Sequence, residues 1–190
     1  KNYKKVDESS DYIYISSSNE MDAPNDHILF NILNNSVYFK NVKTNKKLVI
    51  AGGSSDTDSF TEELKELAKD DNRIIFTGFV QGQILDELYS NTYIYTLPSD
   101  LEGMPLSLLE AMSYGNCCLV SDIPECAEVV EDKALIFKKS DVKSLREKMQ
   151  DACDHPEKVA KMKKQSADFI CEKYNWDDVV EKTIELYRGR

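Results

Sequence analysis

The sequence lacks several features that would assign it to a functional class at once. Lysine and arginine total 24 against 34 aspartates and glutamates, which gives a net charge of −10. A nucleic-acid or anionic-membrane surface needs clustered positive charge, so this balance argues against both. No apolar run approaches the roughly 18 residues of a membrane span. The start, KNYKKVDESS, has neither a signal peptide nor an initiator methionine, so we interpret the chain as a fragment.

Metal and disulfide chemistry find little support in the composition. The five cysteines are scattered at positions 117, 118, 126, 153 and 171, without a CxxC pair. The chain has only two histidines, at positions 27 and 155, and so no histidine cluster near the cysteines; we therefore expect no zinc site. Free thiols in a reducing cytoplasm are the simplest interpretation. The dinucleotide fingerprint GxGxxG is also absent, which argues against a dehydrogenase-type cofactor site.

The sequence does contain an alternation of short apolar runs and amphipathic segments. Four runs rich in β-branched or aromatic residues end in Gly, Pro, Ser or Asp, which is typical of buried strands. They are KLVIAGG (47–53), RIIFTGF (73–79), YIYTLPS (93–99) and CCLVSD (117–122), with helical patterns between them at 60–70, 82–90 and 105–115. This order predicts right-handed βαβ units and a doubly wound, Rossmann-like α/β domain with a parallel sheet covered on both faces.

Further elements are expected at both ends of this core. The segment DYIYI (11–15) should join the same sheet. After the last run we expect a short helix near 125–130 and a strand at 134–137. Ser140–Asp141 has the residue types of a helix cap, for a helix that runs to about 153. The tail from Pro156 onward is predicted to form two more helices, with a break at 173–176.

The stretch SDLEGMPLSLLEAMSYG (99–115) is the strongest candidate for a functional site. Ligands of such sheets bind outside the carboxyl ends of the strands, where this loop begins. The amides that open the following helix can hold a phosphate. Glu110 lies in an otherwise apolar helix, where an unpaired carboxylate is costly, and the hydroxyls of a sugar could pair with it. A structural role, with a lysine or backbone partner, is the alternative for a buried glutamate.

The run EGMPLSLLE, from Glu102 to Glu110, resembles the E-x7-E signature of retaining glycosyltransferases with the GT-B architecture, in particular family 4 (group 1). RIIFTGFV, DELYSNTYIYTLPSDLEGMPLSLLEAMSYG and SDIPECAEVV resemble that family in order and spacing. The resemblance implies one nucleotide-sugar-binding domain over 1–190, the C-terminal half of a GT-B enzyme. It would comprise a divergent segment (1–45), a family-like core (46–138) and a helical tail (139–190).

The resemblance also implies individual roles. Glu110 would bind the ribose hydroxyls of a nucleoside-diphosphate-sugar donor, and Glu102 would contact the transferred sugar as the catalytic residue. The Val80 backbone would meet the base, and amides from Met104 to Ser107 would hold the distal phosphate, apart from Pro105, which has no N–H. Glu128 matches another glutamate of the family, with a structural role as the alternative. The expected donor-binding set is Gly52, Gly53, Val80, Gly103, Met104, Leu106, Ser107 and Glu110, with no metal and no cofactor.

One part of the family pattern is missing. After its first strand the family carries Gly-Arg and then a lysine, two cations that stabilise the diphosphate leaving group. Here DYIYI is followed by SSSNEMDAPNDH, which has neither. Three explanations stay open: a degenerate donor domain, cations supplied from elsewhere, or an imperfect record of this segment. Lys40 and Lys43 are the nearest candidates for recruitment.

We therefore expect the donor-binding domain of a cytoplasmic enzyme that moves a sugar from a nucleoside diphosphate to a sugar or lipid-linked acceptor. An N-terminal acceptor-binding domain would lie outside this chain, so the chain alone should be inactive. Any peripheral membrane contact would be made through that domain. A non-catalytic nucleotide-sugar-binding module is the first alternative. A receiver-like signalling domain ranks last, because Ser16–Ser18 stand where it needs acidic residues.

Overall fold

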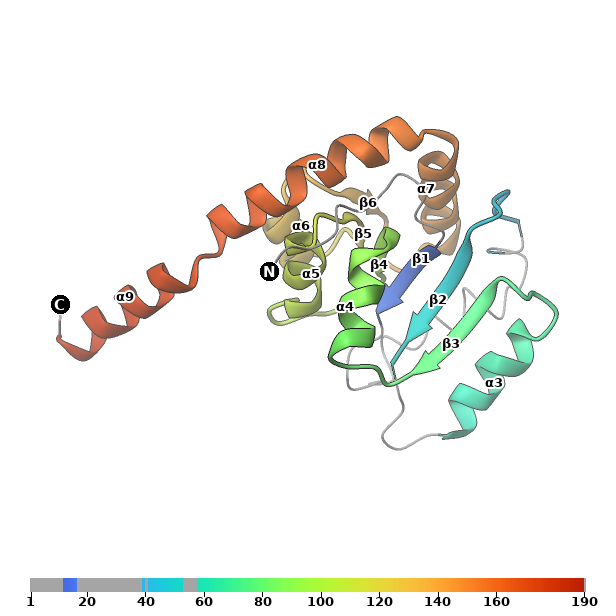
Figure 1. Ribbon diagram of the computed structural model, residues 1–190, viewed down its shortest axis with the longest axis horizontal. Helices are drawn as coiled ribbons and strands as arrows, with labels where there is room; N and C mark the ends of the chain where they lie inside the picture. Colours follow the sequence, from blue (N-terminus) through green and yellow to red (C-terminus); the bar gives the residue numbers. More distant parts are fainter. Residues whose placement is uncertain (1–11, 17–38, 40, 53–57, 190) are drawn as a thin grey trace.

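The computed structural model describes residues 12–16, 39, 41–52 and 58–189, with the backbone alone at 16 and 58–61. These residues form a six-stranded sheet in the order β3-β2-β1-β4-β5-β6, and every strand pair is parallel. The strands are β1 (Tyr12–Ser16), β2 (Lys47–Ala51), β3 (Ile74–Gly78), β4 (Thr92–Leu97), β5 (Cys117–Ser121) and β6 (Leu135–Phe137). The helices are α3 (Asp58–Ala68), α4 (Gln83–Ser90), α5 (Leu106–Ser113), α6 (Pro124–Val130), α7 (Val142–Asp154), α8 (Pro156–Lys173) and α9 (Trp176–Tyr187). The Rossmann-like fold with a helical tail is confirmed (Figure 1).

The strand order places β1 at the centre of the sheet. The chain proceeds from β1 through β2 to β3, crosses to β4 on the other side of β1, and continues outward to β6. The order therefore reverses between β1 and β4. In doubly wound sheets, the crevice outside the carboxyl ends of the strands at such a reversal is the usual ligand site. The strand order alone therefore predicts a ligand site at the carboxyl ends of β1 and β4.

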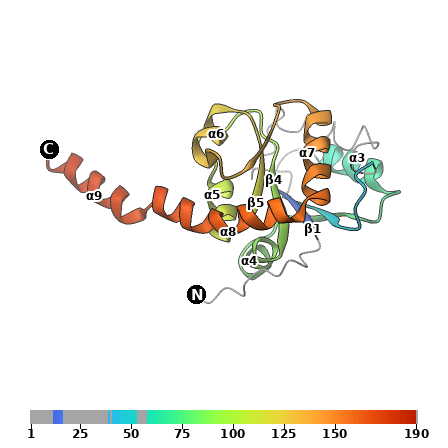
Figure 2. The same ribbon diagram turned by 90° about the horizontal axis from the view of Figure 1, so that it is seen from above.

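Two apolar cores lie on the two faces of the sheet, because successive residues of a strand point to opposite faces. Ile13 and Ile15 belong to the core that also contains residues of α3 and α7. Tyr14, between them, belongs to the core with residues of α4, α5 and α6. Helix α8 contributes to both cores, and Figure 2 shows it crossing beside the sheet between α7 and α5. The face with α4, α5 and α6 carries the candidate site.

A bulge at Tyr93 distributes the tyrosines of β4 between these cores. Tyr12 pairs with Thr92 and Ile13 with Ile94, so Tyr93 is the extra residue. Its side chain joins the α3 and α7 core, where its hydroxyl donates to the carbonyl of Ala152 at 2.8 Å. Tyr95 joins the opposite core. Bulges redirect side chains in this way. Both tyrosines are buried.

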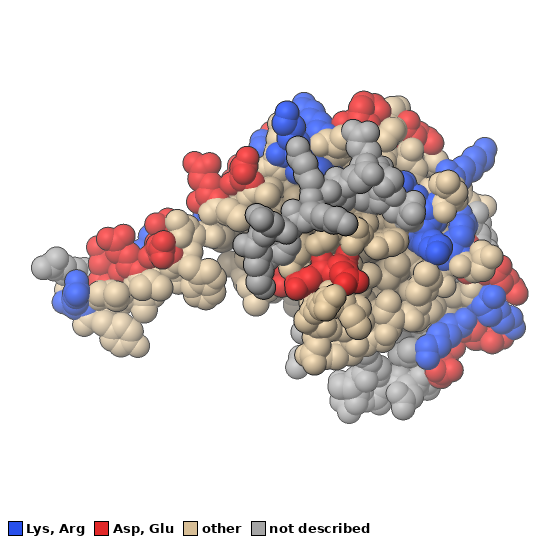
Figure 3. All heavy atoms as spheres, viewed as in Figure 1, with Lys and Arg blue, Asp and Glu red and all other residues tan. Residues whose placement is uncertain are grey.

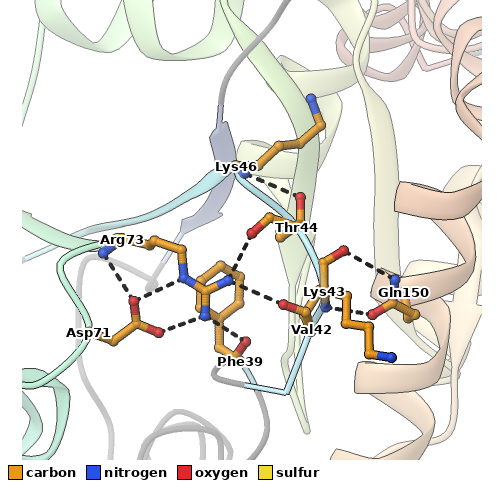
Figure 4. A network of polar contacts seen from close by, with 8 residues as sticks. All are labelled: Phe39, Val42, Lys43, Thr44, Lys46, Asp71, Arg73 and Gln150. Carbon is orange, nitrogen blue, oxygen red and sulfur yellow. Dashed lines mark hydrogen bonds and ion pairs between the residues drawn. The ribbon is translucent and has the colours of Figure 1, made fainter.

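The amino end of the sheet is closed by a polar network around Arg73 (Figure 4). The guanidinium donates to both carboxylate oxygens of Asp71, at 2.9 and 2.7 Å. It also donates to the carbonyls of Val42 and Thr44, at 3.2 and 2.9 Å, and to that of Phe39 at 3.2 Å. These bonds fasten the segment that leads into β2 to the turn that leads into β3.

Lys43 belongs to this amino-end network, which corrects one expectation. Its amide N–H donates to Gln150 Oε1 of α7 at 2.7 Å. Because Lys43 precedes β2, it lies at the edge of the sheet opposite to the carboxyl ends of the strands. Recruitment of Lys43 to a phosphate at those carboxyl ends is therefore wrong. Lys40, the other candidate, lies outside the described residues.

The tail follows the local signals in the sequence. Asp141 caps α7 by accepting a hydrogen bond from the Ser144 amide at 2.9 Å. Asn175, in the break between α8 and α9, caps α9 by accepting from the Asp177 amide at 2.8 Å. Helix α9 has no buried residue and extends away from the sheet (Figure 1). Figure 3 shows acidic side chains on one side of α9 and uncharged ones on the other. None of the helices in the described part of the chain is long and apolar enough to cross a membrane.

Candidate functional site

A pocket of about 170 Å³ opens at the carboxyl edge of the sheet. It is lined by residues of β1, the end of β2, the loop after β3, and helices α4 and α5, beside the reversal between β1 and β4. Its lining residues are Tyr14, Ala51, Gly52, Phe79, Val80, Leu85, Tyr89, Leu106, Ser107 and Glu110. Segments that are far apart in the sequence therefore meet around one cavity.

The pocket unites five of the residues that the sequence analysis selected: Gly52, Val80, Leu106, Ser107 and Glu110. Glu102, Gly103 and Met104 do not line it, and belong to the loop between β4 and α5. Gly53 lies outside the described residues. The candidate residues thus form a pocket group and a neighbouring loop group, both at the carboxyl edge.

Glu110 is exposed, which corrects the expectation of a carboxylate buried inside an apolar helix. Helix α5 has only eight residues, and its buried positions are Leu108, Ala111 and Met112. Leu106 and Glu110, four residues apart, share the side that borders the pocket. Because water solvates the exposed Glu110 carboxylate, it needs no buried partner. The alternative of a buried structural ion pair therefore does not apply to Glu110.

The N-terminus of α5 is open toward an anion. Pro105 is its N-cap and makes no side-chain capping bond. The Leu106 amide donates to the Met104 carbonyl at 2.8 Å, and the amides of Leu108 and Leu109 both donate to the Pro105 carbonyl. Among the described residues, none accepts a hydrogen bond from the Ser107 amide. This amide lies at the positive end of the helix dipole and in the wall of the pocket.

Buried tyrosines form the floor beneath this helix end. The ring of Tyr89 lies 5.5 Å from that of Tyr14 and 5.9 Å from that of Tyr95. The Tyr95 hydroxyl donates to Ser107 Oγ at 2.9 Å, and the Tyr89 hydroxyl reaches the Ser107 carbonyl at 3.5 Å. Burial, followed by the neighbouring tyrosines and Glu110, raises the pKa of Tyr89 far above its usual value. The Tyr89 hydroxyl therefore keeps its proton and acts as a donor.

Sequence reasoning did not find this floor. The sequence analysis selected none of Tyr14, Tyr89 and Tyr95 as a site residue. One usable signal exists: a buried tyrosine needs a partner for its hydroxyl, so tyrosines in apolar strands next to a candidate site merit inspection. Their partners come from other elements of the fold, and sequence spacing does not reveal them.

Glu102 is held in the loop beside the pocket. The Ser99 hydroxyl donates to Glu102 Oε1 at 2.5 Å. The Ser121 hydroxyl, at the end of β5, donates in turn to the Ser99 carbonyl. Burial raises the pKa of the Cys126 thiol to about 12, and the negative charge of Glu102 contributes to this rise. The Glu102 carboxylate therefore lies close enough to Cys126 of α6 to act on it. Glu102 is half-buried and pre-oriented at the carboxyl edge.

Glu128, in contrast, is exposed on α6, and its backbone carbonyl accepts a hydrogen bond from the Lys173 side chain. The described residues contain no group of three or more histidine, cysteine or acidic side chains that could hold a metal ion. The pocket lining contains no lysine or arginine. Ser107, at the positive end of the α5 dipole, lines the pocket.

The fold and the site define a Rossmann-like α/β domain with a pocket at the carboxyl edge of its sheet, beside the N-terminus of α5. The chain belongs to the family described as "Glycosyl transferases group 1", whose model matches residues 31–169. It is 27% identical over 149 residues to "Uncharacterized glycosyltransferase MJ1607" of Methanocaldococcus jannaschii, covering 76% of this chain and 37% of that protein. It is also 27% identical over 145 residues to "O-antigen chain mannosyltransferase B" of Escherichia coli, covering 74% of this chain and 37% of that protein.

Solved structures agree with this membership at the level of the fold. Anabaena Alr3699/HepE in complex with UDP and glucose has a TM-score of 0.81 at 14% identity, over 96% of this chain and 50% of that one. The C-terminal domain of the group 1 glycosyl transferase LpcC from Francisella tularensis has a TM-score of 0.72 at 20% identity, over 86% of both chains. The expected likeness to GT-B glycosyltransferases is confirmed. The chain spans 37% of the length of the two relatives named above.

Proposed function

We propose that this chain is the donor-binding domain of a retaining, family 4 glycosyltransferase that uses a nucleoside-diphosphate-sugar. The observation that carries the proposal is the meeting of Glu110, the Ser107 amide and Val80 around one pocket. These residues offer an acceptor for ribose hydroxyls, a donor for phosphate and an apolar wall for a base. The UDP bound by Alr3699/HepE, a protein of the same fold, supports a nucleotide as the ligand class.

Each part of a nucleotide-sugar finds a chemically matched group. The base would lie against Phe79 and Val80 in the loop after β3, and its ribose hydroxyls would donate to Glu110. The distal phosphate would accept from Ser107 at the helix N-terminus, where the dipole stabilises negative charge. The same donors would stabilise the diphosphate as it leaves, which is electrostatic catalysis by pre-oriented groups. Glu102, half-buried and oriented by Ser99, would receive hydroxyls of the transferred sugar.

The acceptor side of the reaction is proposed to lie outside this chain. Four large apolar side chains are exposed at or near the carboxyl edge: Phe79, Leu101, Met104 and Leu106. Apolar side chains that gather beside a binding site commonly mark an interaction surface. An N-terminal acceptor-binding domain would cover this edge and complete the site for a sugar or lipid-linked acceptor in the cytoplasm. Without it, the 190-residue chain should bind a donor but not transfer its sugar.

A non-catalytic nucleotide-sugar-binding module is the second candidate. The observation that favours it is the absence of the family's Arg and Lys from the sequence after β1. That segment lies outside the described residues, so only the sequence supports this observation. The test is transfer by this chain joined to an acceptor domain of a related enzyme. Donor binding without transfer would support the module, and turnover would exclude it.

The experiment that tests the donor site is calorimetric titration of UDP, GDP and ADP and of their glucose and mannose derivatives. We expect Glu110→Gln to weaken the nucleoside diphosphate and the nucleotide-sugar alike, because both carry the ribose. Glu102→Gln should weaken only the nucleotide-sugar. Each lost charged hydrogen bond should lower affinity about ten- to a hundredfold. Glu63→Gln, at an exposed position of α3, is the matched control and should change neither affinity. Equal losses for both ligands in both site variants would refute the assignment of roles.

A further inference from the structure

Two tyrosine hydroxyls beneath the pocket contact Ser107, the residue at which the proposed function places the distal phosphate. Tyr95 lies on the central strand β4 and is fully buried. Its hydroxyl donates to Ser107 Oγ at 2.9 Å. Ser107 is half-buried and lines the pocket. Because a serine hydroxyl has one hydrogen and two acceptor sites, the bond from Tyr95 uses an acceptor site and leaves the serine hydrogen for another partner.

Tyr89 contacts the same residue through its backbone. Asn116 anchors the Tyr89 backbone by donating from Nδ2 to its carbonyl at 2.9 Å. The Tyr89 ring is packed between those of Tyr14 and Tyr114, at 5.5 and 5.2 Å. The hydroxyl at the end of this anchored ring donates to the Ser107 carbonyl at 3.5 Å, a long hydrogen bond.

We propose that Tyr95 is a positioning residue of the donor site. It directs the hydrogen of the Ser107 hydroxyl into the pocket, toward an oxygen of the distal phosphate, while Tyr89 supports the Ser107 backbone. This inference rests on the proposed function and adds to it: the Ser107 side chain becomes a phosphate donor beside its own amide.

The simpler explanation is that both tyrosines only satisfy buried hydroxyls. The chain offers a matched control for it in Tyr93, on the same strand as Tyr95. Tyr93 is also buried and also donates its hydroxyl across the core, to the Ala152 carbonyl at 2.8 Å, but on the opposite face of the sheet. Removal of the Tyr93 hydroxyl should therefore cost stability without any effect on a ligand in the pocket.

The test compares UDP with UMP on the 190-residue chain, by calorimetry, with thermal melts of each variant. Tyr95→Phe should weaken UDP about three- to tenfold, the value of one neutral hydrogen bond, and leave UMP within about twofold. Ser107→Ala should reproduce this selective loss, and the double variant should lose no more than either single one. Tyr93→Phe should lower the melting temperature without changing the affinity for UDP or UMP.

The outcomes separate this inference from the function on which it rests. If the wild-type chain binds none of UDP, GDP and ADP, the proposed function fails, and the inference with it. If the wild type binds UDP but Tyr95→Phe weakens UDP and UMP equally, or adds its loss to that of Ser107→Ala, the inference alone is overturned. If the chain prefers guanine or adenine to uracil, the comparison of UDP with UMP is replaced by that of GDP with GMP or of ADP with AMP. Should Tyr95→Phe not fold, Ser107→Ala decides, because a loss shared by both nucleotides refutes the phosphate contact.

Discussion

Replacement of Arg73 should test the network at the amino end of the sheet (Figure 4). Arg73→Met removes the guanidinium but keeps an unbranched side chain. Asp71, which is 7% exposed, then loses two charged hydrogen bonds, and the carbonyls of Phe39, Val42 and Thr44 lose their bonds to the guanidinium. We expect a marked loss in the free energy of unfolding.

The magnitude follows from the exposure of the pair. Removal of one partner of a fully buried ion pair costs about 3–5 kcal/mol. The side chain of Arg73 is 23% exposed, so water can replace some of the lost bonds. We therefore expect Arg73→Met to lower the free energy of unfolding by about 2–4 kcal/mol. Arg73→Lys keeps the charge but not the forked donors, and should lose about half as much.

Urea unfolding followed by far-ultraviolet circular dichroism measures this loss. The double variant Asp71→Asn/Arg73→Met should lose less than the sum of its two single variants, because neither charge is then left without the other. UDP affinity of the folded protein should be unchanged, since the network lies at the edge of the sheet opposite to the pocket. A loss below about 1 kcal/mol for Arg73→Met would refute the reasoning, because it would fall below even one unpaired buried group.

Three further predictions concern the rest of the fold. Burial lowers the pKa of Lys163 to about 8. Above that pH the unfolded state binds more protons than the folded state. The wild type should therefore gain stability relative to Lys163→Met as the pH rises from 8 toward 10. A difference in urea midpoints that stays constant over this pH range would contradict this. Gly115 has a φ of +76°, so Gly115→Ala should lower the free energy of unfolding by about 1–2 kcal/mol, whereas Gly103→Ala, which meets no atom within 4 Å, should leave thermal melts unchanged. Removal of residues 175–190 should not lower the melting temperature, because no residue of α9 is buried; a drop of several degrees would show that α9 packs on the domain.

Much of the fold could be predicted because its signals are local. The cap at Asp141, the proline at position 156 and the break at 173–176 each act within a few residues, and the structure confirms all three helices they predict. The strand runs were predictable because a parallel strand covered on both faces is apolar throughout. The bulge at Tyr93 could not be predicted, because it depends on the register between β1 and β4 and not on either strand alone.

The site was predictable in outline but not in detail. The fold rule for carboxyl ends selected the edge where the pocket lies, and the loop and helix from Glu102 to Glu110 lie there. The prediction that Glu110 is buried was wrong. Composition shows that α5 is apolar, but it does not show which side of the helix faces solvent. The roles of Tyr89 and Tyr95 depend on contacts to a helix that follows them by 12 to 18 residues. Such contacts arise only when the sheet and helices assemble.

The exposed helix α9 determines how this domain can be observed. Trp176, at its start, is the single tryptophan of the chain and is 80% exposed. Its emission should already be that of a hydrated indole in the native protein, so tryptophan fluorescence would follow the tail and miss the unfolding of the sheet. The ten tyrosines give the informative signal, because Tyr14 and Tyr89 border the pocket directly. Near-ultraviolet dichroism of these packed rings should change when a nucleotide enters, which would report ligand binding without any label.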